Sequence, residues 1–259
     1  MRRLGVFDSG VGGLTLLRAL QQVMPACPFL YLADTAALPY GEKSPAEIIH
    51  RTELVTQYLE HAGCSIIVYA CNTACTVAHQ TVQAQGEVPH FEIISPLREQ
   101  LLLSRARPLG VLCTRATAES GVFQQLGEER GSPYRVLACP DLVPLIEGNA
   151  PLEQLQRAVK RYCRELCTGF LPEIVVLGCT HYEALRGLFQ QYLPPCTHII
   201  SQPALLTVAF QRYVRNHEVL IDTIDTTPRT EYCCTAPVEV PQAFTPYISP
   251  STPWHGISL

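Results

Sequence analysis

Short runs of apolar residues alternate along this chain with longer stretches in which apolar residues recur at helical spacing. The short runs have the length of buried strands. We expect strands at residues 4–7, 29–33, 66–70, 92–94, 109–112, 135–138, 174–178 and 198–200. Strands that alternate with helices form parallel sheets, and the active sites of such sheets lie at the carboxyl ends of the strands. The pattern therefore predicts an α/β fold with its site at those ends.

Two further segments differ in their patterning. The clearest helical pattern has apolar residues on one face at positions 152, 155, 159, 162 and 166, and Gly169 is expected to end that helix. From Asp222 onward the chain is rich in threonine and proline. This composition predicts irregular structure, and we identify no chemistry in it.

Two segments of the first half of the chain are echoed in the second half. Residues 4–9, LGVFDS, resemble residues 109–114, LGVLCT. Residues 67–73, IVYACNT, resemble residues 175–181, VVLGCTH, at a nearly equal offset. Matched offsets indicate duplicated strand–helix units. Each copy of the second segment presents a cysteine just past a predicted strand, Cys71 in one and Cys179 in the other.

Composition and charge exclude several classes of function. Of the 259 residues, 47% are hydrophobic and 16% are charged, which suits a large core and argues against disorder. The net charge is -4 and the arginines are scattered, so a nucleic-acid partner is not expected. No apolar run is long enough to span a membrane, and Asp8 interrupts the apolar run that follows the N-terminal arginine pair. We expect a cytoplasmic protein.

Twelve cysteines are a high number for such a chain. A disulfide scaffold is normally a short secreted chain, and this one is neither short nor visibly secreted. No C-x-x-C pair is present, so a zinc site and a thiol redox site are poorly supported, and no metal is expected. Most of the cysteines should be reduced, buried and simply hydrophobic. Cys71 and Cys179 stand apart because Asn72, Thr73 and Thr180 follow them. These residue types cap helices, and the positive end of a helix favours a thiolate.

Two cysteines in related halves suit the inversion of a carbon centre. Inversion removes a proton from one face of the carbon and delivers another proton to the opposite face. A thiolate and a thiol on either side of the substrate do this in both directions by exchanging roles. Many racemases use pyridoxal phosphate bound to a lysine, but the only lysines are Lys43 and Lys160, and neither has a phosphate-binding context. We therefore expect no cofactor.

Several motifs in combination resemble those of bacterial glutamate racemases. Residues 5–14, GVFDSGVGGL, resemble the N-terminal signature of that family. The resemblance continues through residues 33–35 (ADT), 39–41 (PYG), 70–74 (ACNTA), 139–147 (CPDLVPLIE) and 177–182 (LGCTHY). It covers the chain from about residue 4 to about residue 190.

The resemblance implies a fold and a setting. Proteins of the aspartate/glutamate racemase superfamily have two pseudo-symmetric flavodoxin-like or Rossmann-like α/β domains with mainly parallel sheets and the active site in the cleft between them. Here the first domain would comprise residues 1–95 plus 205–259, and the second residues 96–204. The resemblance also implies a homodimer, a glutamate substrate, and D-glutamate as a product that supplies peptidoglycan synthesis.

The matched motifs further imply roles for single residues. Cys71 resembles the base that acts on D-glutamate, and Cys179 the base that acts on L-glutamate. Asp8 would assist Cys71 and His181 would assist Cys179, with Glu147 a further candidate. The positions that match residues binding the polar groups of the substrate are Ser9, Pro39, Tyr40, Gly41, Asn72, Thr73, Thr114, Thr117 and Thr180.

Simpler interpretations of some of these residues remain open. The glycines at positions 10, 12 and 13 suit a tight turn as well as backbone amides that hold a carboxylate. Tyr40 suits a packed loop, Glu147 a solvated helix end, and Thr114 and Thr117 suit helix caps.

The sequence also leaves two wider questions open. Residues 200–203, ISQP, stand where the family usually has an acidic residue after the final strand of the second domain, and the proline-rich tail replaces its helical ending. The alternative functions are a racemase for aspartate or a related amino acid, and a non-catalytic binding protein on the racemase fold.

Overall fold

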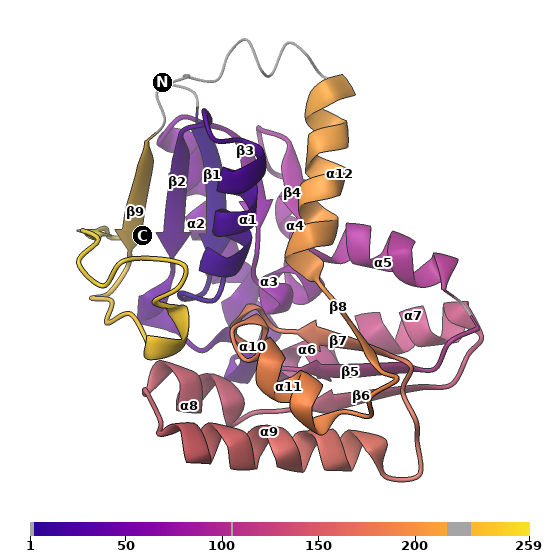
Figure 1. The fold of residues 1–259 in the computed structure, drawn as a ribbon. Helices are drawn as coiled ribbons and strands as arrows, with labels where there is room; N and C mark the ends of the chain where they lie inside the picture. Colours follow the sequence, from indigo (N-terminus) through magenta and orange to yellow (C-terminus); the bar gives the residue numbers. More distant parts are fainter. Residues whose placement is uncertain (1–2, 105, 217–228) are drawn as a thin grey trace.

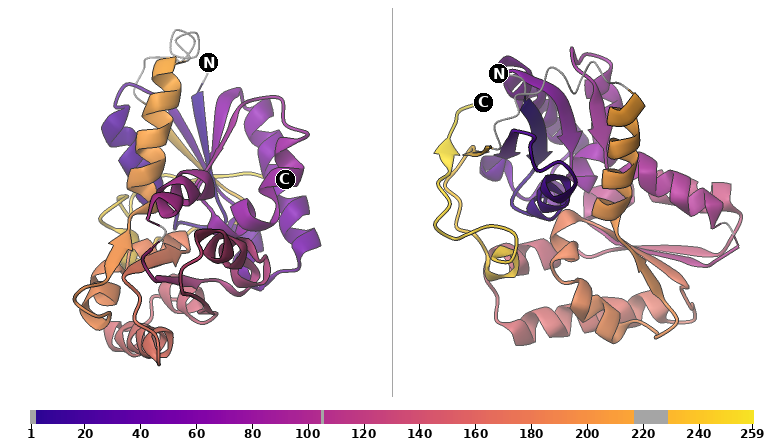
Figure 2. Two further views of the ribbon diagram at one scale, coloured as in Figure 1. Left: turned by 90° about the vertical axis from the view of Figure 1, so that its right-hand side faces the viewer. Right: turned by 45° about the horizontal axis from the view of Figure 1, so that its top comes forward.

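The computed structural model describes residues 3–104, 106–216 and 229–259, and contains two parallel sheets. The six-stranded sheet has the order β10-β9-β2-β1-β3-β4, and the four-stranded sheet has the order β6-β5-β7-β8. In Figure 1 the strands of the first sheet run vertically in the upper part of the molecule, and those of the second sheet run roughly horizontally below them. The two views in Figure 2 show the same division into two lobes.

The first lobe is built from the N-terminal third of the chain. Its elements are β1 (Arg3–Asp8), α1 (Leu14–Val23), β2 (Phe29–Ala33), η1 (Thr35–Ala37), η2 (Tyr40–Glu42), α2 (Pro45–His61), β3 (Cys64–Tyr69), α3 (Asn72–Val77), α4 (His79–Gln83) and β4 (His90–Glu92).

The second lobe follows in the middle of the chain. Its elements are α5 (Ile94–Leu103), β5 (Leu109–Cys113), α6 (Arg115–Glu119), α7 (Val122–Arg130), β6 (Tyr134–Ala138), α8 (Leu142–Glu147), α9 (Leu152–Cys167), β7 (Ile174–Gly178), α10 (Thr180–Glu183), α11 (Arg186–Tyr192) and β8 (His198–Ile200).

The rest of the chain returns to the first lobe. It contains α12 (Gln202–Asn216), β9 (Thr230–Cys234), η3 (Gln242–Phe244) and β10 (His255–Gly256). Helix α12 packs against α1 and α5 and stands beside the first sheet in Figure 1. Strand β9 pairs with β2, so the tail extends the first sheet by two strands.

The predicted duplication is confirmed by the strand order. The core of the first sheet reads β2-β1-β3-β4, and the second sheet reads β6-β5-β7-β8, which is the same order of equivalent strands. The two echoed segments occupy equivalent places, β1 with β5 and the end of β3 with the end of β7. Each lobe is therefore a doubly wound unit with its site expected at the carboxyl ends of its central strands.

Three expectations from the sequence were wrong in detail. The strand expected at residues 92–94 is β4, which ends at Glu92, because the carboxylate of Glu92 accepts the N–H groups of Ile94 (2.5 Å) and Ser95 (2.6 Å) and so helps to begin α5. Leu152 is 61% exposed although its spacing placed it on the buried face of α9, since it is the first residue of that helix. The tail was expected to be irregular, but it forms β9 and β10; residues 222–228 lie outside the described part.

Most of the cysteines are buried and unpaired, as the sequence predicted. All twelve are free thiols, and only Cys167 and Cys196 are not buried. Burial raises the pKa of Cys27 and of Cys64 to about 12, so these side chains act as small apolar residues. Among the described residues, no helix is both long and apolar enough to cross a membrane.

His79, in α4, generates a prediction about stability and pH. Its ring is buried against Tyr69, with ring centroids 5.2 Å apart, and burial lowers its pKa to about 4. The pKa of histidine in an unfolded chain is about 6.5, so between these pH values the unfolded state binds a proton that the folded state does not. The free energy of unfolding should therefore fall by about 3 kcal/mol as the pH falls through this window.

The measurement is urea unfolding at several pH values for the wild type and for His79→Gln. We expect the variant to lose most of this pH dependence, because glutamine takes up no proton. His50→Gln is the matched control, since His50 is exposed and in α2. If the free energy of unfolding depended on pH equally in His79→Gln and in the wild type, His79 would not be the source of this pH dependence.

Candidate active site

The carboxyl ends of the two sheets enclose one small cavity. Ser9 follows β1, Cys71 follows β3, Thr114 follows β5 and Cys179 follows β7, and all four line it. The cavity has a volume of about 10 Å³, which is room for about one water molecule. The two lobes are therefore closed on each other.

Cys71 lies at the N-cap position of α3 and is 4% exposed. Its thiol donates a hydrogen bond to Oγ of Ser9 at 3.5 Å. The helix end favours a thiolate through the N–H of Ala74, but burial, followed by the charge of Asp8, outweighs it in this closed site and raises the pKa of Cys71 to about 12. The cap prediction was wrong, because the cysteines rather than Asn72, Thr73 and Thr180 occupy the two N-cap positions.

Cys179 has a different environment on the opposite side of the cavity. Its Sγ lies 3.9 Å from Nδ1 of His181, and Nε2 of His181 lies 2.5 Å from Oε1 of Glu147. Burial by itself lowers the pKa of His181, but the hydrogen bonds to Cys179 and Glu147 and their charges raise it well above its usual value. The arrangement is a thiol, an imidazole and a carboxylate in series.

Asp8 lies behind the cavity rather than in its wall. Oδ1 accepts the N–H of Gly10 at 2.9 Å, and Oδ2 accepts the hydroxyl of Thr180 at 3.1 Å. Burial raises the pKa of Asp8, although the charge of His181 opposes this shift. Asp8 therefore ties the loop after β1 to the start of α10 in the other lobe.

Two glycines allow the lobes to approach this closely. A Cβ atom on Gly12 would collide with Oγ1 of Thr180 and lie 2.6 Å from Nδ1 of His181. A Cβ atom on Gly41 would lie 2.6 Å from Cβ of Thr114. Neither clash has room to relax, since each meets a buried residue of the other lobe. Gly12 thus serves the contact between the lobes as well as the turn.

Three threonines form a second contact between the lobes. Oγ1 of Thr73 lies 3.0 Å from Oγ1 of Thr114 and 3.3 Å from Oγ1 of Thr117. Thr114 is also the N-cap of α6, where it accepts the N–H of Thr117 at 3.3 Å. Thr114 is therefore both a cap and part of the cavity wall, whereas Thr117 supports the wall from behind.

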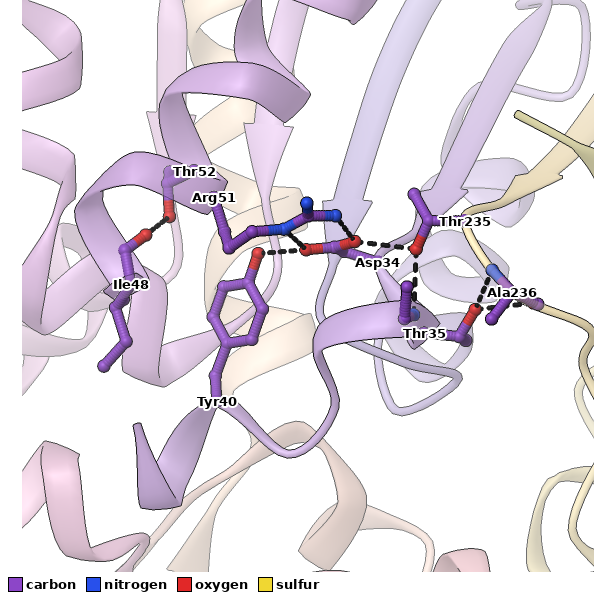
Figure 3. A network of polar contacts seen from close by, with 9 residues as sticks. Asp34, Thr35, Tyr40, Ile48, Arg51, Thr52, Thr235 and Ala236 are labelled. Atoms are coloured by element: carbon purple, nitrogen blue, oxygen red, sulfur yellow. Dashed lines mark hydrogen bonds and ion pairs between the residues drawn. The ribbon is translucent and has the colours of Figure 1, made fainter. Parts of the chain in front are cut away.

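Tyr40 is held by a buried carboxylate, as Figure 3 shows. Its hydroxyl donates to Oδ2 of Asp34 at 2.6 Å. Asp34 also pairs with Arg51 and accepts the hydroxyl of Thr235 at 2.7 Å. Because Thr235 follows β9, the tail helps to fix the Pro39–Gly41 loop that lines the cavity. The hydroxyl of Tyr40 is thereby committed to Asp34 rather than free for a ligand.

Most of the residues singled out in the sequence gather here. Those that line the cavity are Ser9, Pro39, Tyr40, Gly41, Cys71, Asn72, Thr73, Thr114, Cys179, Thr180 and His181. Asp8, Thr117 and Glu147 do not line it but contact residues that do. Glu147 ends α8, as a solvated helix end would, but its carboxylate is turned onto His181.

Sequence reasoning missed the contribution of the tail and of helix α12. Phe244, in η3, is fully buried, and its ring packs edge-on to the ring of His181 with centroids 5.6 Å apart. Gln202 donates a hydrogen bond to Asn72. Leu38 and Val143 also line the cavity. Gln202 lies in the ISQP segment that departs from the family and Val143 in the 139–147 motif, but neither pattern indicated a contact with the site, which each residue reaches only through the fold.

The described part of the chain contains no cluster of side chains suited to binding a metal ion. No group of three or more His, Cys, Asp or Glu side chains there is arranged to hold a metal ion.

Comparison with known proteins gives a consistent result. The family model described as Asp/Glu/Hydantoin racemase matches residues 14–209. The chain is 36% identical to the glutamate racemase of Phenylobacterium zucineum over 242 residues, which covers 83% of this chain and 86% of that protein.

Two solved structures are similar over almost their whole length. The glutamate racemase of Thermus thermophilus in complex with β-chloro-D-alanine is 30% identical, with a TM-score of 0.81 over 100% of this chain and 97% of that chain. The structure of a glutamate racemase isoform of Bacillus anthracis has a TM-score of 0.87 over 100% of this chain and 98% of that chain. Its sequence is 24% identical to this one, so this comparison establishes a similar fold and nothing more.

The Asp34 network generates a prediction. Asp34→Asn removes the charge that pairs with Arg51, and an amide cannot accept from all of its present donors. We expect the variant to lose on the order of 3 kcal/mol in the free energy of unfolding, measured in urea. The matched control is Asp141→Asn, because Asp141 also bonds to an arginine and a tyrosine, Arg161 and Tyr162, but is 42% exposed. The control should lose less than about 1 kcal/mol, and an equal loss in both would contradict the role given to burial.

Proposed function

Because this chain belongs to the Asp/Glu/Hydantoin racemase family, we propose that it interconverts L-glutamate and D-glutamate with two cysteines and no cofactor. The observation that carries the proposal is the pair of thiols in one cavity. Cys71 and Cys179 come from equivalent places in the two lobes and line the same small space. The choice of glutamate is supported by the relatives, which are glutamate racemases.

The proposed reaction moves one proton off Cα and another onto its opposite face. From L-glutamate, the Cys179 thiolate takes the α-proton, and the Cys71 thiol gives its proton to the other face of the carbanion. One turnover leaves Cys179 as a thiol and Cys71 as a thiolate, which is the state needed for the reverse reaction. Exchange of protons with water restores the starting state.

The two environments support a preferred state of the empty site. His181, which Glu147 keeps protonated, lies beside Cys179 and stabilises a thiolate there. Cys71 is held as a thiol by burial and by the charge of Asp8. The empty protein is thus proposed to be set for L-glutamate, with Cys179 as base, Cys71 as acid, and Asp8, His181 and Glu147 as the groups that tune them.

The polar wall of the cavity supports binding of an amino acid. Hydroxyls and amides reach it from both lobes, and donors of this kind bind carboxylates. We propose that the substrate's polar groups are bound by Ser9, Pro39, Tyr40, Gly41, Asn72, Thr73, Thr114 and Thr180, with Thr117 supporting Thr114. Since the Tyr40 hydroxyl is engaged by Asp34, its proposed contribution is to shape the pocket.

A closed cavity of about 10 Å³ cannot admit glutamate. We propose that the lobes separate to let the substrate in, with residues 1–95 plus 205–259 moving as one unit and residues 96–204 as the other. The setting that we propose is a cytoplasmic homodimer whose D-glutamate supplies peptidoglycan synthesis.

The test is a racemisation assay without added cofactor. Purified protein is incubated with L-glutamate, D-glutamate or L-aspartate, and the enantiomers are separated by chiral chromatography. We expect turnover of both glutamate enantiomers, and a loss of about 10³-fold or more in Cys71→Ala and in Cys179→Ala.

The matched control is Cys64→Ala, which removes a buried cysteine at the opposite end of β3. It should keep its activity. Turnover of aspartate alone would replace glutamate as the substrate, and no turnover by folded, reduced protein would favour a binding protein on this fold. Full activity in either Cys71→Ala or Cys179→Ala would contradict the two-cysteine mechanism.

A further inference from the structure

One hydrogen bond joins the start of helix α12 to the residue after Cys71. Nε2 of Gln202 donates to Oδ1 of Asn72 at 2.9 Å, across a separation of 130 residues in the chain. Gln202 is 3% exposed and Asn72 is 1% exposed, so water does not compete for either group. This bond is therefore a fixed part of the closed site.

The bond determines which end of the Asn72 amide is occupied. A side-chain amide has an accepting oxygen at one end and two N–H donors at the other. Oδ1 of Asn72 is engaged by Gln202, whereas Nδ2 is buried and has no hydrogen-bond partner among the described residues. Buried polar atoms in folded proteins almost always have partners, so a donor without one beside a cavity is available to a ligand or a water molecule there.

The unpartnered donor belongs to a residue that lines the cavity. If the amide were reversed, Asn72 would present an oxygen to the cavity, and an oxygen repels a carboxylate. While Gln202 presents its Nε2 donor, this reversal is disfavoured, because the reversed amide would set two N–H groups against each other. Gln202 thus selects the orientation that suits an anionic ligand.

We propose that Gln202 is a positioning residue that holds the Asn72 amide with its N–H groups ready to donate to a carboxylate of the substrate. This inference rests on the proposed racemisation of glutamate and adds a specificity determinant to it. The position suits the task, since Gln202 begins α12 and only one residue separates it from the end of β8, where the chain leaves the second lobe. Helix α12 packs on α1 of the first lobe, and Gln202 lies beside Asn72 while the two lobes are closed.

The experiment is steady-state kinetics of a double-mutant cycle, with thermal unfolding as a parallel readout. Gln202→Met keeps the length of the side chain but removes its donor. We expect the KM for both enantiomers of glutamate to rise about tenfold while kcat changes less than about threefold. Asn72→Ala should raise KM by a similar factor. Gln202→Met should add nothing further in the Asn72→Ala background, because Gln202 then has no amide to orient.

Two further variants separate positioning from packing. Gln202→Glu keeps the shape but accepts instead of donating, which turns the Asn72 amide around. It should raise KM more than Gln202→Met does, and the unfolding temperature records separately the cost of burying a carboxylate. Gln211→Met is the matched control in the same helix and should leave KM unchanged.

The outcomes distinguish this inference from the function on which it rests. Wild-type protein that turns over glutamate, together with an unchanged KM in Gln202→Met and Gln202→Glu, would overturn the inference alone. Additive effects on KM in the double mutant would also overturn it, since they would show that Gln202 acts without Asn72. Wild-type protein that does not turn over glutamate would overturn both.

Discussion

The site depends on one constraint, which is that the carboxyl ends of two parallel sheets face each other across a very short distance. The residues after β1, β3, β5 and β7 meet because two glycines allow close contact between the lobes: Gly12 against Thr180 and His181, and Gly41 against Thr114. A side chain at either position would hold the lobes apart. Because the two lobes repeat the same strand order, the cysteines that follow the equivalent strands β3 and β7 both line this cavity.

The two halves are alike in fold but not in electrostatics. Cys179 has an imidazole and a carboxylate in series behind it, while Cys71 has a hydroxyl beside it and a buried carboxylate nearby. This difference is the basis for the proposal that the two cysteines have unlike roles in the empty site, although a racemase needs them to exchange roles. A small polar ligand that brings its own charges into the cavity changes this balance, because interactions are strong where water is excluded.

The strands could be predicted from the sequence because a buried parallel strand is a short apolar run, and the echoed segments located both cysteines. The rest depended on contacts that no local pattern records. Strand β9, TEYCC, lies in a polar, proline-rich segment and is a strand because β2 offers it an edge. Phe244 and Gln202 reach the site from segments remote in sequence. The effect of burial on Cys71 likewise outweighs the helix end that the sequence suggested.

The central claim is that separate groups act on the two faces of Cα. The most direct test follows deuterium at Cα in D2O during the first few per cent of conversion of L-glutamate, with the enantiomers separated before mass analysis. Two bases predict deuterium in nearly all of the D-glutamate formed, because the thiol of Cys71 delivers a deuteron taken from D2O. They predict almost no deuterium in the remaining L-glutamate, because the proton removed from Cα stays on Cys179 and is not returned to the same face. Deuterium entering both pools at the same rate, or D-glutamate that keeps its original proton, would show a single base and contradict the account.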